Sequence, residues 1–172
     1  MKKAKYKITI TALFLILILA FSTSAIGCGS ASIATASYWS EASVIVKEQI
    51  EECGRPYSEL LLEIIPDMAT GEYEAVEKFF LAAKEYYPVI GEAILDLSKL
   101  NPPNEETAKW QEKQLESWSL RQKAFYIYMS CWDYQNGIIT GTEQDLLEGD
   151  RLFEESQAVG KEADKLQREM IR

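Results

Sequence analysis

Apolar side chains recur three and four residues apart over most of the chain after residue 38, and this spacing constrains the fold more than any other feature. Because an α-helix has 3.6 residues per turn, the spacing places these side chains on one face of a helix. A strand would need apolar and polar residues in strict alternation, and we see no such signal here. The pattern therefore predicts an all-α protein.

Two predicted helices occupy the first half of the repeating pattern. The first extends from Trp39 to Met68. Its phase continues across Gly54-Arg55-Pro56, so we expect one helix with a kink rather than two helices. The second extends from Tyr73 to Leu97, and the pattern continues unshifted past Pro88, which should kink this helix without ending it.

Two further helices follow the breaker Asn101-Pro102-Pro103-Asn104. Asn104 is a good N-cap for the third helix, and Asn136-Gly137 is a signal for its end. Thr142 and Asp145 have the spacing of a capping box that opens the fourth helix. Four long helices with short connections, each with one apolar face, predict an antiparallel up-down-up-down four-helix bundle with long, partly kinked helices.

The N-terminal segment has the order of charges and apolar residues typical of an export signal. Lysines occupy positions 2, 3, 5 and 7, and an apolar run follows from Ile8 to Phe21. The residues Ala25-Ile26-Gly27-Cys28 resemble the lipobox of prokaryotic lipoproteins. That resemblance implies cleavage before Cys28, lipid attachment to Cys28 (including palmitate) and a location on the extracytoplasmic side of the cell membrane.

Two other interpretations of this segment stay open. Ile8 to Ile26 is close to the length needed to span a membrane, so the signal could remain as an uncleaved anchor. Ordinary cleavage after Ala25 is the third route. We predict a signal peptide over residues 1–27, a flexible tether of small polar residues over 28–37 and one bundle domain over 38–172. In its plan this domain resembles uncharacterised helical lipoproteins in which a Pro-Pro turn precedes a long third helix.

Charge and composition exclude several classes of function. Without the four N-terminal lysines, 14 basic residues face 27 acidic ones, a net charge of −13. A domain with this negative charge repels phosphate backbones, and nucleic acid is therefore not an expected partner. The chain has no histidine, which excludes histidine-based triads, histidine zinc sites and the Glu-x-x-His di-iron motif. We predict no catalytic residues, no metal and no cofactor.

Two cysteines follow Cys28, and they leave two alternatives open. Cys53 lies on the predicted inner face of the first helix, and Cys131 lies next to Trp132 at the end of the third. Outside the cytoplasm the two thiols could form a disulfide. Alternatively, each is buried separately and acts as a small apolar side chain.

Aromatic residues concentrate on the third predicted helix and give the one indication of a ligand. Most of them should belong to the core. If some line a cleft near Gln111, Arg121 and Gln122, flat rings and amides together would suit a small polar-aromatic ligand or a sugar. The residues that define this candidate ligand face are Trp118, Gln122, Tyr128 and Trp132.

These observations favour a membrane-tethered, non-catalytic module that interacts with an envelope or surface protein. The alternative is a small-ligand-binding or sensory bundle that uses the aromatic face of the third helix. An enzyme with an unfamiliar carboxylate or tyrosine site is the third hypothesis.

Overall fold

The computed structural model describes residues 33–171, so the predicted signal peptide and Cys28 lie outside the described residues. Helices account for most of this part of the chain. They are α1 (Ile33–Gln49), a π-helical segment η2 (Ile50–Gly54), α2 (Arg55–Thr70), α3 (Tyr73–Lys99), α4 (Glu105–Ser130) and α5 (Glu143–Ile171). Because α1, η2 and α2 follow one another without a break, they form one long first helix, as the sequence predicted.

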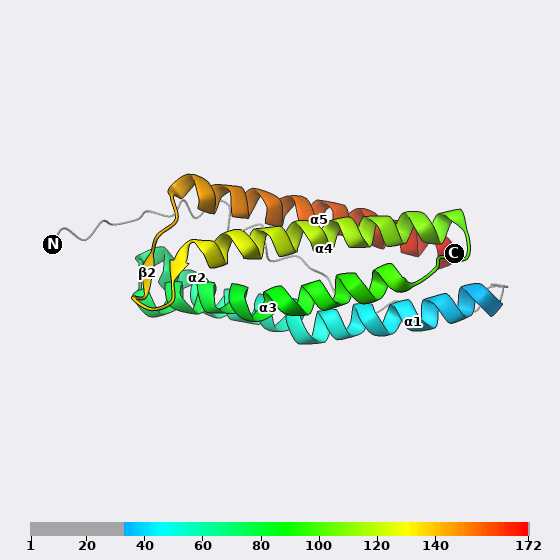
Figure 1. The fold of residues 1–172 in the computed structure, drawn as a ribbon, viewed down its shortest axis with the longest axis horizontal. Helices are drawn as coiled ribbons and strands as arrows, with labels where there is room; N and C mark the ends of the chain where they lie inside the picture. Colours follow the sequence, from blue (N-terminus) through cyan, green and yellow to red (C-terminus); the bar gives the residue numbers. More distant parts are fainter. Residues whose placement is uncertain (1–32, 172) are drawn as a thin grey trace.

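The described part of the chain is an all-α helical bundle, which confirms the predicted fold class. Figure 1 shows the connections between successive helices alternating between the two ends of the bundle, with α4 and α5 side by side. The caps predicted at two helix starts are present. Asn104 Oδ1 accepts the backbone N–H of Thr107, and the side chains of Thr142 and Asp145 bond each other's backbone N–H groups. None of the helices between residues 33 and 171 is long and apolar enough to cross a membrane.

The π-helical segment explains how the first helix tolerates Pro56. Proline has no N–H to donate, and its ring would collide with the carbonyl group one turn earlier in a regular α-helix. In η2 the turn is widened, and the backbone N–H of Arg55 donates to the carbonyl of Ile50, five residues earlier. The predicted kink therefore takes the form of a π-bulge.

The bulge also changes which side chains of the first helix face the core. From Cys53 onward, the spacing correctly predicted that Cys53, Tyr57, Ile64 and Met68 are buried, but Leu61 is buried in place of the predicted Leu60, which is half-buried. Before the bulge, the buried face is displaced by one residue, because the extra residue in the bulge rotates the preceding helix. Tyr38, Ala42 and Gln49 are buried where the spacing predicted Trp39, Ser43 and Ile50. Packing against the bundle begins at Tyr38, although the helix itself starts at Ile33, within the predicted tether.

A β-hairpin replaces the predicted last turn of the third helix. The sequence showed no strand signal, yet β1 (Trp132–Asp133) pairs antiparallel with β2 (Ile138–Ile139). The helix ends early because Trp132 stacks on Phe80 of α3, with ring centroids 4.9 Å apart. A long-range contact between aromatic rings thus overrides the local helical pattern.

The turn of this hairpin depends on two residues. One carboxylate oxygen of Asp133 accepts the backbone N–H groups of Gln135 and Asn136, as in an Asx turn. Gly137 has a φ of +63°, a backbone conformation that residues other than glycine rarely adopt. The Asn136-Gly137 pair therefore marks a hairpin turn and not a helix end.

Small residues bring α4 and α5 close together. The hydroxyl of Ser117 donates to the backbone carbonyl of Ser156 at 2.8 Å. Gly160 faces Ser117 one turn further along α5, and Gly149 lies against the ring of Tyr128. Since a Cβ is missing at both glycines, the two helix backbones can approach each other closely.

The two interface glycines should respond differently to alanine. A Cβ at Gly149 would lie 2.5 Å from the Tyr128 ring, which is 3% exposed and has no room to move. We expect G149A to lower the free energy of unfolding by about 1–2 kcal/mol, since overpacking outweighs the helix propensity of alanine. In G160A the nearest atom is the Ser117 hydroxyl at 3.1 Å, so we expect a change below about 0.5 kcal/mol. Urea denaturation measures the free energy of unfolding of both variants. Equal losses in G149A and G160A would contradict the close contact between Gly149 and the Tyr128 ring.

Candidate functional site

The π-bulge places two polar side chains inside the bundle. Gln49 is 4% exposed and Cys53 is 1% exposed. The Gln49 side chain lies beside the Cys53 thiol. Because π-bulges are often found at functional sites, the residues around this segment are the first place to search for one.

Arg121 reaches the same region from the middle of α4. Its guanidinium carbon lies 5.5 Å from the centroid of the Phe153 ring on α5. It also interacts electrostatically with Cys53 and Tyr57 of the first helix. Burial lowers the pKa of the Arg121 guanidinium, which nonetheless stays cationic at neutral pH. An arginine is thus held among side chains that carry no formal charge.

Two hydrogen-bond donors of this region lack acceptors. Arg121 Nε and Gln157 Nε2 are buried and have no hydrogen-bond partner within residues 33–171, whereas the Gln49 side chain hydrogen-bonds with the Cys53 thiol. Over the same residues no ion pair includes Arg121. Gln157 follows Phe153 by four residues, so both lie on the same face of α5. We call Arg121 and Gln157 the donor cluster.

The donor cluster has the chemistry of a binding site for an acceptor. A buried polar group without a hydrogen bond is costly, and an unpaired buried charge is more so. A small anion would supply the missing acceptors and the counter-charge together. The rings of Tyr57 and Phe153 beside Arg121 would bound such a ligand with apolar surface.

The two cysteines are free, and the structure does not contain the candidate disulfide. Cys53 lies at the level of Arg121, whereas Cys131 follows the end of α4 ten residues later. Ten helical residues extend about 15 Å, and disulfide formation needs Cα atoms within about 7 Å. Burial raises the pKa of the Cys53 thiol to about 12, so it behaves as a buried small side chain and not as a nucleophile.

The candidate ligand face of the third helix is used mainly for packing. Trp118, Tyr128 and Trp132 are all buried. Trp132 stacks on Phe80, and the Tyr128 hydroxyl donates to Asp150. Gln122 is half-buried and lies next to Gly91 on α3. The rings of this predicted face therefore belong to the core and do not form an open surface.

Gln111, the other glutamine of that prediction, has a structural role. Its side-chain amide donates to the backbone carbonyls of Leu97 and Leu100. These carbonyls lie at the end of α3, where no further helical turn supplies donors. Gln111 thus satisfies a helix end and is not available to a ligand.

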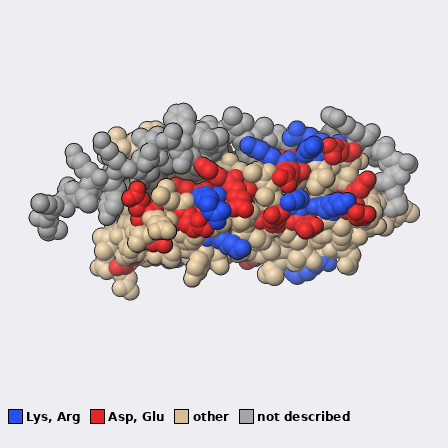
Figure 2. Space-filling view, turned by 90° about the horizontal axis from the view of Figure 1, so that it is seen from above, with Lys and Arg blue, Asp and Glu red and all other residues tan. Residues whose placement is uncertain are grey.

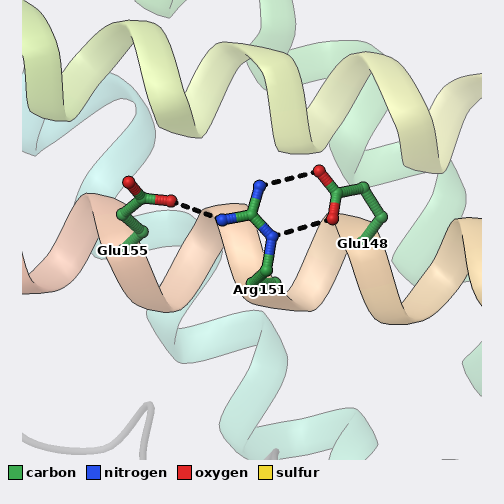
Figure 3. A network of polar contacts seen from close by, with 3 residues as sticks. All are labelled: Glu148, Arg151 and Glu155. Carbon is green, nitrogen blue, oxygen red and sulfur yellow. Dashed lines mark hydrogen bonds and ion pairs between the residues drawn. The ribbon is translucent and has the colours of Figure 1, made fainter.

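The acidic residues of α5 form solvated ion pairs. Figure 2 shows acidic and basic side chains intermixed on the α5 side of the molecule. In Figure 3, Arg151 bonds both carboxylate oxygens of Glu148 and one of Glu155. These are exposed contacts between neighbouring turns of one helix, which contribute little to stability. Across the described residues, no group of three or more cysteine, aspartate or glutamate side chains could hold a metal ion.

Asp150 and Asp145 on α5 should show opposite dependences on pH. Burial raises the pKa of Asp150 above 3.8, although the hydrogen bond from Tyr128 opposes this. The ionised form therefore destabilises the fold above the raised pKa, and stability increases as the pH falls through that value. We expect D150N, which can still accept the Tyr128 hydrogen bond, to be more stable than the parent protein at pH 7 and equal to it below about pH 3.8.

Asp145 provides the matched control. Its hydrogen bonds with Thr142 lower the pKa of its carboxyl group below 3.8. Its stabilisation is complete above the unfolded value of about 3.8 and is lost as the pH falls through the lowered pKa. D145N should therefore be less stable than the parent at pH 7. Urea denaturation from pH 3 to 7 measures both, and a lower stability of D150N at pH 7 would contradict the role of burial at Asp150.

The hairpin end of the bundle exposes apolar side chains. Tyr73, Tyr134 and Ile138 are 55%, 36% and 53% exposed. Tyr73 packs against Trp132 and Gly137, the Tyr134 hydroxyl donates to the carbonyl of Phe80, and Lys84 Nζ lies 4.5 Å from the centroid of the Tyr134 ring. We call these three residues the hairpin patch. The segments that carry these residues also carry acidic residues close by in the sequence, namely Glu72, Glu74, Asp133, Glu143 and Asp145.

Comparison of the chain with protein-family models, curated proteins and solved structures gave no significant match. The site therefore has to be interpreted from its own chemistry. Of the polar residues in this region, the sequence indicated only Arg121, as part of the lining of a cleft with Gln111 and Gln122. Gln49 carried no signal because the π-bulge that buries it is not apparent in the spacing, and Gln157 is one of several polar residues on α5.

Proposed function

We propose that the protein is a lipid-anchored, extracytoplasmic and non-catalytic module that presents its hairpin patch to a partner protein. Lipid attachment at Cys28 would tether the chain five residues before α1 begins at Ile33. In Figure 1 the start of α1 and the hairpin lie at opposite ends of the bundle. A tethered bundle would therefore hold the hairpin patch away from the membrane, and this is the observation that carries the proposal.

The chemistry of the hairpin end suggests the kind of partner. Isolated exposed apolar residues are common on protein surfaces, but a contiguous group with a polar rim is typical of an interaction site. Here the apolar group is aromatic and aliphatic, and the charged residues of the adjoining segments are mostly acidic, with Lys84 over the Tyr134 ring. The partner that fits is a protein of the membrane or cell surface whose own apolar patch is bordered by basic residues.

Two experiments test the two halves of this proposal. The anchor is tested with C28S, which should lose incorporation of labelled palmitate and leave the membrane fraction. If C28S remains as membrane-bound as the parent and uncleaved, the protein is held by an uncleaved anchor and not by a lipid.

The partner is tested by co-purification from detergent-solubilised membranes, in which the parent is compared with I138D and with the control L95D. Leu95 is similarly exposed but lies toward the other end of α3.

The two aspartate variants should give different results. We expect I138D to lose a partner that the parent and L95D retain, and we expect salt to weaken the complex because the rim is charged. If the same proteins co-purify with I138D and the parent, the hairpin patch is not the binding surface.

Binding of a small ligand is a second candidate function, and the donor cluster is the observation that favours it.

A further inference from the structure

The outward side of α3 carries exposed apolar residues at regular intervals. Leu81 is 45% exposed and Leu95 is 60% exposed, and Pro88 between them is exposed as well. Successive members of this set are seven residues apart, close to two helical turns, so the three side chains form one line along the helix. We call Leu81, Pro88 and Leu95 the α3 stripe. Within residues 33–171 it is a helix face without a packing partner.

The charged residues beside the α3 stripe are arranged symmetrically about Pro88. Lys84 lies four residues before Pro88, and Glu92 lies four residues after it. Both are exposed, and neither has an ion pair in the described part of the chain. Glu77 and Lys99 repeat the arrangement with the signs exchanged, eleven residues before and after Pro88. Each of these four charges therefore has an opposite charge at the same distance on the other side of Pro88.

We propose that the α3 stripe binds the α3 stripe of a second copy of this chain, with the two helices antiparallel and Pro88 on the two-fold axis. In a symmetric interface of this kind, residues at equal distances before and after the axis face each other. Leu81 then packs on Leu95 of the partner subunit, and Lys84 pairs with Glu92 of the partner subunit. Each contact occurs twice, so two apolar contacts and two ion pairs form around the central prolines.

The charges favour this arrangement over the alternatives. A parallel pair would place Lys84 beside Lys84 and Glu92 beside Glu92, and like charges in contact weaken an interface. An anionic membrane surface would meet five acidic and only three basic residues on α3. A second copy supplies the matching order of charges by itself. Since Lys99 also pairs with Asp96 on its own helix, Lys84 and Glu92 contribute most to this complementarity.

An antiparallel pair also determines where the ends of the two bundles lie. In Figure 1, α3 ends at the end of the bundle where α1 begins. The two α1 starts therefore lie at opposite ends of the pair. If Cys28 carries the lipid of the proposed function, the pair joins molecules held on two facing membranes. The pairing itself does not rest on that function, because the α3 stripe contains neither the anchor nor any residue of the hairpin patch.

The test measures self-association of the full chain in detergent by analytical ultracentrifugation. One pair of helix faces is a small interface, so we expect a dimer with a Kd of about 10–100 µM. K84E and E92K each bring like charges together twice and should each weaken the dimer about tenfold or more. The double variant K84E/E92K restores both ion pairs with the signs exchanged, so its Kd should return to within about threefold of the parent value.

The control is K161E, which makes the same change in net charge at an exposed residue of α5 and should dimerise as the parent does. L95D should be monomeric and yet retain the hairpin partner, whereas I138D should dimerise normally. The proposal is overturned if the parent stays monomeric up to about 500 µM, if K161E is as weak as K84E, or if the double variant remains as weak as K84E. A general loss of folding in K84E cannot imitate the expected pattern, because the second substitution would not reverse it.

Discussion

F125A is expected to lower the free energy of unfolding by about 3–5 kcal/mol, the largest stability effect that we predict. The Phe125 side chain is completely buried in α4. Its ring lies 4.9 Å from that of Tyr57 on α2 and 6.1 Å from that of Phe153 on α5. The truncation would therefore open a cavity where three helices meet. This loss is a large part of the total stability of an ordinary domain, which is about 5–15 kcal/mol.

The neighbouring aromatic residue provides the control for this substitution. Tyr126 is 60% exposed and makes only a distant ring contact with Tyr87. Y126A should change the free energy of unfolding by less than about 1 kcal/mol. Urea denaturation followed by circular dichroism measures both variants. A similar loss in Y126A and F125A would mean that the ring cluster of Tyr57, Phe125 and Phe153 does not hold the helices together.

R121M is expected to raise the free energy of unfolding by about 1–3 kcal/mol in the absence of ligand. Methionine preserves much of the aliphatic stem and its packing against Phe153, and it removes a charge and a buried N–H that has no acceptor. The cation–π contact with Phe153 is lost, but such a contact contributes only about 0.5–2 kcal/mol. A more stable R121M variant would show that Arg121 is retained at the expense of stability.

K123M is the comparison, because Lys123 is exposed on the same helix. It should change stability by no more than about 0.5 kcal/mol. Thermal and urea denaturation without added small anions measure both variants. If R121M is less stable than the parent by more than about 1 kcal/mol, Arg121 stabilises the fold through contacts other than those described, and the donor cluster has a structural role.

Local sequence patterns were sufficient for the fold class and for the starts of α3, α4 and α5, whereas α1 begins at Ile33, six residues before the predicted start. The breaker at residues 101–104 and the capping residues Asn104 and Thr142 act over three or four residues, so their effect does not depend on distant partners. The inner face of the first helix from Cys53 to Met68 was correct except at Leu60, where Leu61 is buried instead, because helical periodicity is itself a local property. These features needed no knowledge of how the helices pack.

The positions of the candidate site residues could not be predicted from the sequence alone. The aromatic residues Trp118, Tyr128 and Trp132 were grouped as a candidate ligand face because they share one helix, but packing against α3 and α5 places them in the core. Gln111 was grouped with them, and only the position of the end of α3 gives its amide a structural role. Residue type and spacing indicated where polar groups lie along a helix, but not which neighbour each would meet.

The sequence by itself determined that this chain forms long helices with one apolar face each, because periodicity and capping are properties of neighbouring residues. Tertiary structure alone decided three further features. The packing of the first helix against the bundle buries Gln49, Trp132 stacks on Phe80 where α4 gives way to the hairpin, and the approach of α5 to α4 places Phe153 against Arg121. Each depends on residues far apart in the chain, whose contacts exist only once the bundle has formed.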